Sequence, residues 1–363
     1  MKTVLYPEHL KLKAKIVDFH GWDMPIQYSN IIEEHTAVRK KVGLFDLSHM
    51  GRIWVRGKDR KTWLDRILTV DIPKMAPGRA RYTFLLTDRG TVIDDLLAYE
   101  DADHDASFLV VNASNREKNL EWMQKQVGGA RIKIEDETTA TALVAVQGPK
   151  SIEAVKLALD ADPSTLKYYT FGRFPILGTK DVMVSRTGYT GEDGFEIFVP
   201  NGLAAKIWTA LLKVAKKTGL KPVGLGARDT LRTEAGMPLY GQEIDDQTTP
   251  LEAGLDFAVA LDKGAFIGRE SLLSQKAAGP PKRLVGFKME GRRISRQGMD
   301  VYAAGEKAGV VTSGTFSPSL DASIGMAHVK PEHSAVGTAL EIDVRGKREP
   351  AKTVPLPFYK RAR

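Results

Sequence analysis

The chain has 363 residues, of which 42% are hydrophobic and 27% charged, a balance typical of a globular protein with two or three domains. It contains no cysteine, which excludes disulfides, thiolate metal sites and a cysteine nucleophile. The net charge of +8 indicates an anionic partner, but the Lys and Arg residues form no nucleic-acid-binding motif. An acidic protein or a polyanionic cofactor fits equally well, and the charge alone does not decide among these partners.

The N-terminal residues carry no targeting signal that we recognise. Residues 1–9 have neither the apolar core of a signal peptide nor an Arg- and Ser-rich transit pattern. No apolar run approaches the roughly 20 residues that span a bilayer. We therefore expect a cytoplasmic protein without a membrane-bound part.

Helices and strands mix in the first half of the chain without a repeating βαβ rhythm. Residues 30–41 predict a helix, because Asn30 and Glu33 have the spacing of a capping box. Residues 50–136 predict the order β-α-β-β-β-α-β, which is close to a ferredoxin-like unit. Its expected segments are a strand at 51–57, a helix at 58–70, strands at 81–87, 91–99 and 108–112, and a helix that Ser114 and Glu117 cap, with Leu120, Met123 and Val127 facing inward.

The second half of the chain predicts a mixed region and then a small all-β domain. The mixed region has a strand at 143–146, a helix with Ile152, Val155 and Leu159 inward, a hairpin at 182–199 and a helix at 203–217. Gly279-Pro280-Pro281 is the clearest boundary, because it interrupts both helix and strand. Beyond it, short strands at 284–287, 301–302, 309–312, 324–329 and 340–344 alternate with Gly-rich turns.

The hairpin at 182–199 is the most informative segment. Gly188, Gly191 and Gly194 allow close approach of the backbone to a flat ligand, and Tyr189 offers a ring face and a hydroxyl. The nearby carboxylates are those of Glu192, Asp193 and Glu196, which can accept paired N–H donors. Such a hairpin suits a planar, amine-rich ring such as a pterin. A Gly-rich turn with solvated acids is the alternative.

Asp94 and Asp95 lie inside an apolar predicted strand. Because successive side chains of a strand point to opposite faces, at least one carboxylate faces a covered side of the sheet. A carboxylate there requires a partner or a catalytic purpose. A structural Asp paired with Arg79 or Arg81 remains the alternative.

Arg228 and Arg232 stand four residues apart on a predicted helix, with Asp229 and Glu234 nearby. The pattern fits a salt-bridge ladder on the surface, or an Arg that fixes a carboxylate. The histidines show no ligand spacing, and Asp101, Asp103 and Asp105 lack the rest of a calcium loop, so we expect no metal.

Taken together, these segments resemble the glycine cleavage T-protein family of aminomethyltransferases, from about residue 5 to residue 359. The matching stretches are residues 17–28, 43–51, 93–96, 111–115, 147–149, 185–196, 224–232, 240–243, 249–255 and 312–318. The resemblance implies an α+β fold of three domains arranged as a cloverleaf. These are a discontinuous folate-binding domain (1–50 plus 137–278), a ferredoxin-like domain (51–136) and a C-terminal β-barrel or jelly-roll domain (279–363).

The resemblance also implies a reaction. The methylene of aminomethyl-dihydrolipoyl H-protein, which carries a lipoyl arm, moves to tetrahydrofolate with release of ammonia. Asp95 matches the catalytic carboxylate, which would hold or relay a proton. The positions that match the folate site are Tyr82, Val110, Asn112, Tyr189, Glu196 and Arg228. No metal, nucleic acid or membrane is expected, and the chain would be a monomer or weak dimer.

Two other functional classes share this architecture. A folate-dependent demethylase would take a methyl group from a small donor, and a pI near 9.3 favours instead a docking face for an acidic carrier. Folate-binding relatives that assist iron–sulfur assembly carry a cysteine, which this chain lacks. Two departures from the family pattern are Met237, where some members have Tyr, and a short tail. With this tail, a distal basic contact to the folate glutamate is either missing or supplied by Arg361 or Arg363.

Overall fold

The structure is a computed structural model that describes residues 1–362. Its fold is mixed α and β, as the sequence predicts, with a closed barrel near the C-terminus. The chain divides into two compact units. The first comprises residues 1–63, 73–82 and 96–229, and the second comprises residues 64–72, 83–95 and the chain from 230 onward. The three-domain division with boundaries at residues 51, 137 and 279 stays a prediction.

A six-stranded sheet forms the centre of the first unit, in the order β10-β11-β12-β9-β3-β13. The last pair is parallel and the others are antiparallel. The edge strand β10 contains Pro175, where its register with β11 shifts, and the other edge strand ends at Pro222. The strands are β3 (Val42–Asp46), β9 (Thr141–Gln147), β10 (Phe171–Ile176), β11 (Thr179–Ser185), β12 (Gly194–Pro200) and β13 (Leu220–Pro222).

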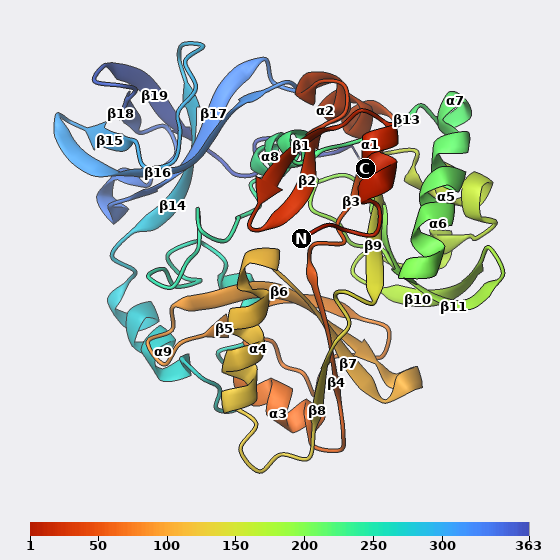
Figure 1. Ribbon diagram of the computed structural model, residues 1–363. Helices are drawn as coiled ribbons and strands as arrows, with labels where there is room; N and C mark the ends of the chain where they lie inside the picture. The colour runs from red at the N-terminus through yellow and green to blue at the C-terminus, as the bar shows by residue number, and fades with distance from the viewer. Residues whose placement is uncertain (363) are drawn as a thin grey trace. The chain divides into compact units, whose positions relative to one another are not determined.

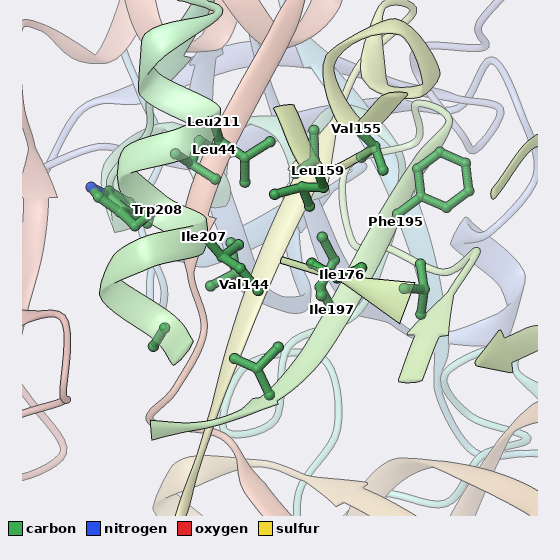
Figure 2. Packing of buried hydrophobic residues seen from close by; sticks show 14 of the residues in the cluster. Leu44, Val144, Val155, Leu159, Ile176, Phe195, Ile197, Ile207, Trp208 and Leu211 are labelled. Carbon is green, nitrogen blue, oxygen red and sulfur yellow. The ribbon is translucent and has the colours of Figure 1, made fainter. Parts of the chain in front are cut away.

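Helices α5 (Ser151–Leu159) and α6 (Asn201–Lys213) pack against each other and against this sheet (Figure 1). Figure 2 shows the apolar core between them, with Trp208 and Leu211 of α6 near Leu44 of β3. Their buried stripes recur at the helical period that the sequence predicts. The predicted helix at 203–217 ends at Lys213, and a separate short helix, α7 (Ala215–Thr218), follows.

The N-terminal segments complete the mixed part of the first unit. Asn30 caps α2 as predicted, since its side-chain oxygen accepts from the Glu33 N–H at 2.9 Å. Nearby, Asp46 receives hydrogen bonds from Thr3 at 2.6 Å and His9 at 2.9 Å. The elements are α1 (Tyr6–Lys11), β1 (Lys15–Phe19), β2 (Trp22–Gln27) and α2 (Ile31–Lys40).

A five-stranded sheet in the order β5-β6-β7-β4-β8 follows the predicted β-α-β-β-β-α-β sequence of elements. Residues of β5 and β6 belong to both compact units. The elements are β4 (Gly51–Arg56), α3 (Arg60–Ile67), β5 (Ala80–Leu86), β6 (Val92–Asp101), β7 (Ala106–Val111), α4 (Arg116–Lys125) and β8 (Lys133–Asp136).

The predicted start of α4 is wrong. The helix begins at Arg116, its N-cap is Asn115, and no side chain caps it, so Ser114 and Glu117 form no capping box. Asn119 and Met123 are its buried residues, whereas Leu120 and Val127 are only half-buried. A short 3-10 turn at Ala113–Asn115 shifts the helix start and rotates the inward face.

The C-terminal strands close into a barrel in the second unit (Figure 1). Val285, Phe287, Val301 and Ile342 are among the buried residues that fill it. The sequence predicts five of its strands and misses the last. The strands are β14 (Arg283–Met289), β15 (Asp300–Ala303), β16 (Glu306–Ser317), β17 (Ala322–Val329), β18 (Ala339–Asp343) and β19 (Arg348–Val354).

Two further helices precede the barrel in the sequence. Helix α8 (Leu225–Glu234) carries Arg228 and Arg232, and α9 (Arg269–Ala278) ends at Gly279. Within residues 1–362, no helix is long and apolar enough to cross a membrane.

Candidate functional site

The hairpin of β11 and β12 presents the carboxylate of Glu196 in the first unit. Glu196 pairs with Ser185 across the hairpin, and only 7% of its surface is exposed. Its Oε2 accepts a hydrogen bond from the Thr187 hydroxyl at 2.5 Å. Burial raises the pKa of Glu196, while the Thr187 hydroxyl and the Arg228 charge oppose that rise. A desolvated carboxylate of this kind can accept further N–H donors.

Arg228 of α8 lies against Tyr189 in the same unit. The guanidinium carbon is 4.6 Å from the centroid of the tyrosine ring, which is the geometry of a cation–π contact. The Arg228 charge also opposes the rise in the pKa of Glu196, so Arg228, Tyr189 and Glu196 lie close together. The group combines a buried carboxylate, a guanidinium and an aromatic face.

His49 and Tyr99 lie beside this group, and the sequence reasoning assigned them no role. Burial first, and then the charge of Arg228, lower the pKa of His49 to about 3, so its imidazole is neutral at physiological pH. The His49 ring packs edge-on against Phe19 at 5.6 Å between centroids. Burial, and then the Glu196 charge, raise the pKa of Tyr99, whose hydroxyl lies 3.5 Å from that of Thr187. The sequence pointed to His49 only through its position in residues 43–51, which match the family pattern.

Two glycines of the hairpin, Gly188 and Gly194, lie against a protein side chain. A Cβ at Gly188 or Gly194 would overlap the side chain of Gln147 on β9, so the close neighbour is this glutamine. Gln147 Nε2 donates to the Thr187 carbonyl at 3.0 Å and thereby holds the turn. These two glycines therefore make room for a protein side chain.

Two of the three hairpin acids form ion pairs with arginines. Glu192 pairs with Arg39 at 3.0 Å, and Asp193 pairs with Arg186 at 2.6 Å. The reading of these acids as solvated is wrong for both, because each has an arginine partner. Glu196, by contrast, is hydrogen-bonded by a neutral hydroxyl and retains the raised pKa.

Asp94 and Asp95 stand on β6 in the second unit. Asp94 is completely buried and Asp95 is half-buried, which agrees with opposite faces of the strand. Burial raises the pKa of Tyr240, and the carboxylates of Asp246, Asp94, Asp245 and Asp95 raise it further. The cluster concentrates carboxylates around a phenol.

Arg232 does not belong to a surface ladder. It is 1% exposed, and its guanidinium donates to Glu243 at 2.8 Å and to Ser313 at 2.8 Å. Glu234 is also buried and accepts from Ser319 Oγ at 2.8 Å. The surface interpretation is wrong because the residues that bury these side chains come from distant parts of the sequence.

The remaining predicted residues lie on or next to other elements. Tyr82 is half-buried on β5, Val110 is buried on β7 opposite Leu97, and Asn112 follows β7 directly. Met237 is half-buried just after α8. Arg363 lies outside the described residues.

No group of three or more His, Cys, Asp or Glu side chains within residues 1–362 is arranged to hold a metal ion.

Comparison with known proteins finds similarity over the full length. The family model described as the GCVT N-terminal domain matches residues 5–263, and the Glycine cleavage T-protein C-terminal barrel domain matches residues 282–360. An aminomethyltransferase of Geobacillus thermodenitrificans is 47% identical over 363 residues, covering 100% of this chain and 99% of that relative. One from Caldanaerobacter subterraneus is 47% identical over 360 residues, with 99% and 96% covered.

A solved structure agrees with this match. The glycine cleavage system aminomethyltransferase T from Bartonella henselae superimposes with a TM-score of 0.93 and 34% identity, covering 99% of this chain and 98% of that one.

Proposed function

The chain belongs to the glycine cleavage T-protein family and is an aminomethyltransferase, and we propose that its substrates are aminomethyl-dihydrolipoyl H-protein and tetrahydrofolate. In this reaction the C–S and C–N bonds of the aminomethyl group break, while bonds from the same carbon to N5 and N10 of the folate form. The two folate protons leave with ammonia and with the dihydrolipoyl thiol. The folate product is 5,10-methylenetetrahydrofolate.

The buried carboxylate of Glu196 is the observation that carries this proposal. A pterin presents neighbouring N–H donors along one edge, and a desolvated carboxylate binds such a pair strongly because both donors compensate its lost hydration. Arg228 balances the negative charge, and Tyr189 offers an aromatic face. We assign Tyr82, Val110 and Asn112 to the same ligand.

Asp95 is the residue that we assign to proton transfer. It is half-buried on β6, and its carboxylate is one of those near Tyr240. A carboxylate that holds or relays a proton, and stabilises positive charge on the folate nitrogens, meets the needs of this transfer.

The proposed carrier partner follows from the reaction and from charge. The chain carries a net charge of +8 with a pI near 9.3, which suits the docking of an acidic carrier protein. Binding to H-protein should therefore weaken as ionic strength rises from low to physiological values. Affinity that is insensitive to salt would contradict a basic docking surface.

The decisive experiment measures ammonia release from aminomethyl-loaded, lipoylated H-protein, with and without tetrahydrofolate. Release that depends on folate supports the proposal. Retained folate binding without release would point to a demethylase, which a screen of small methyl donors would then identify. Glu196→Gln should weaken folate binding and so raise the folate concentration that the release requires. Glu121→Gln, at an exposed position on α4, serves as the matched control.

A further inference from the structure

A cavity of about 630 Å³ lies wholly within the second unit, between the barrel and the segment that precedes α9. Its lining includes Gln242, Thr248, Lys282, Lys307, His328 and Lys330, and we call it the barrel groove. The volume falls in the range of small-molecule sites. None of the residues assigned above to folate binding or proton transfer lines it.

We propose that the barrel groove binds a small organic anion that carries two or more phosphate or carboxylate groups. Three lysines line it from three separate segments, namely Lys282 just before β14, Lys307 on β16 and Lys330 just after β17. Asp245 is the one carboxylate in the lining. This excess of positive charge attracts an anion with more than one charged group.

The lysines differ in how they are held. Lys307 pairs with Asp300 at 2.7 Å, whereas Lys282 donates to the Thr248 hydroxyl at 2.9 Å and lies 3.7 Å from the Glu252 carboxylate. Within residues 1–362, Lys330 has no ion pair, and it is exposed at the rim of the groove. His328 adds no charge near neutral pH, because burial lowers its pKa. The groove therefore has one lysine without an ion pair, Lys330, and two whose ammonium groups are shared with carboxylates outside its lining.

Hydrogen bonds hold the walls of the groove in place. His328 Nε2 donates to the Glu243 carbonyl at 2.8 Å, and Gln297 Nε2 donates to the Gly241 carbonyl at 2.6 Å. Together with the bond from Lys282 to Thr248, these contacts join the barrel to residues 241–248. A ligand that enters a preformed groove loses little free energy to ordering its walls.

The floor of the groove favours an organic anion over inorganic phosphate. It is formed by β16, where Val310 is 37% exposed. An apolar surface beside ammonium groups suits a ligand with a carbon skeleton between or beside its charges. Phosphate esters and polycarboxylates share this chemistry.

The test is calorimetric titration of the full chain, without folate or H-protein, using ATP as the phosphate probe and triglutamate as the carboxylate probe. We expect saturable binding of at least one probe, and the tighter probe identifies the source of the anionic groups. Lys330→Gln, at an exposed position, should weaken that binding about tenfold. Lys352→Gln, at an exposed position on β19 outside the groove, should leave it unchanged.

Two results would overturn the proposal. One is the absence of saturable binding for both probes up to about 1 mM, the weak end of specific affinity. The other is equal weakening by Lys330→Gln and Lys352→Gln, which would indicate attraction to the overall charge. Since ammonia release is measured separately, failure here leaves the proposed transfer reaction untouched.

Discussion

Arg232 and Glu243 form an ion pair of 2.8 Å whose two side chains are 1% and 0% exposed. The same guanidinium donates to Gln242 and Ser313, and Thr312 donates to the carboxylate at 2.6 Å. The pair thereby links α8 to the barrel strand β16 within the second unit. Its hydrogen bonds offset the large cost of removing both charges from water.

Removing one partner of this pair should strongly destabilise the chain. Arg232→Met leaves the Glu243 carboxylate buried without its cation, which typically costs about 3–5 kcal/mol of unfolding free energy. Urea unfolding of the purified variant measures this loss. Adding Glu243→Gln should recover part of it, because the uncompensated charge is gone.

A matched control for this prediction is Arg292→Met. Arg292 pairs with Asp321 at 3.3 Å, but the two side chains are 81% and 72% exposed, so its loss should leave the unfolding free energy unchanged. Equal destabilisation by the two arginine variants would contradict the role of burial.

Replacing Asp95 tests the assignment of proton transfer. Asp95→Asn should lower turnover about a hundredfold or more and leave folate affinity within a few-fold, since the amide keeps the shape but cannot exchange a proton. Ammonia release and folate titration separate the two effects. Asp246→Asn, an exposed carboxylate near the same tyrosine, should retain turnover. Unchanged turnover in the Asp95 variant would remove this residue from the mechanism.

The raised pKa of Glu196 predicts a pH-dependent stability. Because the folded chain binds this proton more tightly, the stabilisation is complete below the ordinary value of 4.5 and is lost as pH rises through the raised pKa. The Glu196→Gln variant has no carboxylate to titrate at this position. The difference between its unfolding free energy and that of the unsubstituted chain should therefore increase with pH. Urea unfolding at several pH values from about 4 to about 8 measures the trend. A difference that stays constant with pH would contradict it.

Gly188 should not tolerate a side chain. Gly188→Ala places a methyl group on Gln147, which must abandon its hydrogen bond to the Thr187 carbonyl or displace the turn. We expect a loss of about 1–3 kcal/mol by thermal unfolding, as for other overpacked sites. Gly202→Ala is the control, because a Cβ there meets nothing within 4 Å and the residue lies in α6. Its stability should rise slightly.

Local signals in the sequence predicted most of the elements. The Asn30 cap and the apolar stripes of α5 and α6 depend on neighbours within a few residues, so the sequence carries them directly. Strand β19 was not predicted, because it has a proline and few apolar residues in its sequence, Arg-Glu-Pro-Ala-Lys-Thr-Val. Barrel closure supplies its pairing with β14 and β18.

The site was less predictable than the fold. The burial of Arg232 depends on Glu243 and on Ser313, and the second of these is 81 residues away. The pKa of Tyr240 depends on Asp94 and Asp95, which no spacing rule connects to it. The local helix pattern allowed either a surface ladder or an Arg that fixes a carboxylate, and long-range packing decides for the second at Arg232.

The prolines at both edges of the six-stranded sheet have a consequence for how molecules meet one another. An edge strand exposes unpaired N–H and C=O groups that can recruit a strand from a second molecule. Pro175 removes one of these donors where the register of β10 shifts, and Pro222 removes another at the end of β13. Each proline thus works against edge-to-edge pairing of two molecules, and replacing Pro175 by valine would restore a backbone donor at that point of β10.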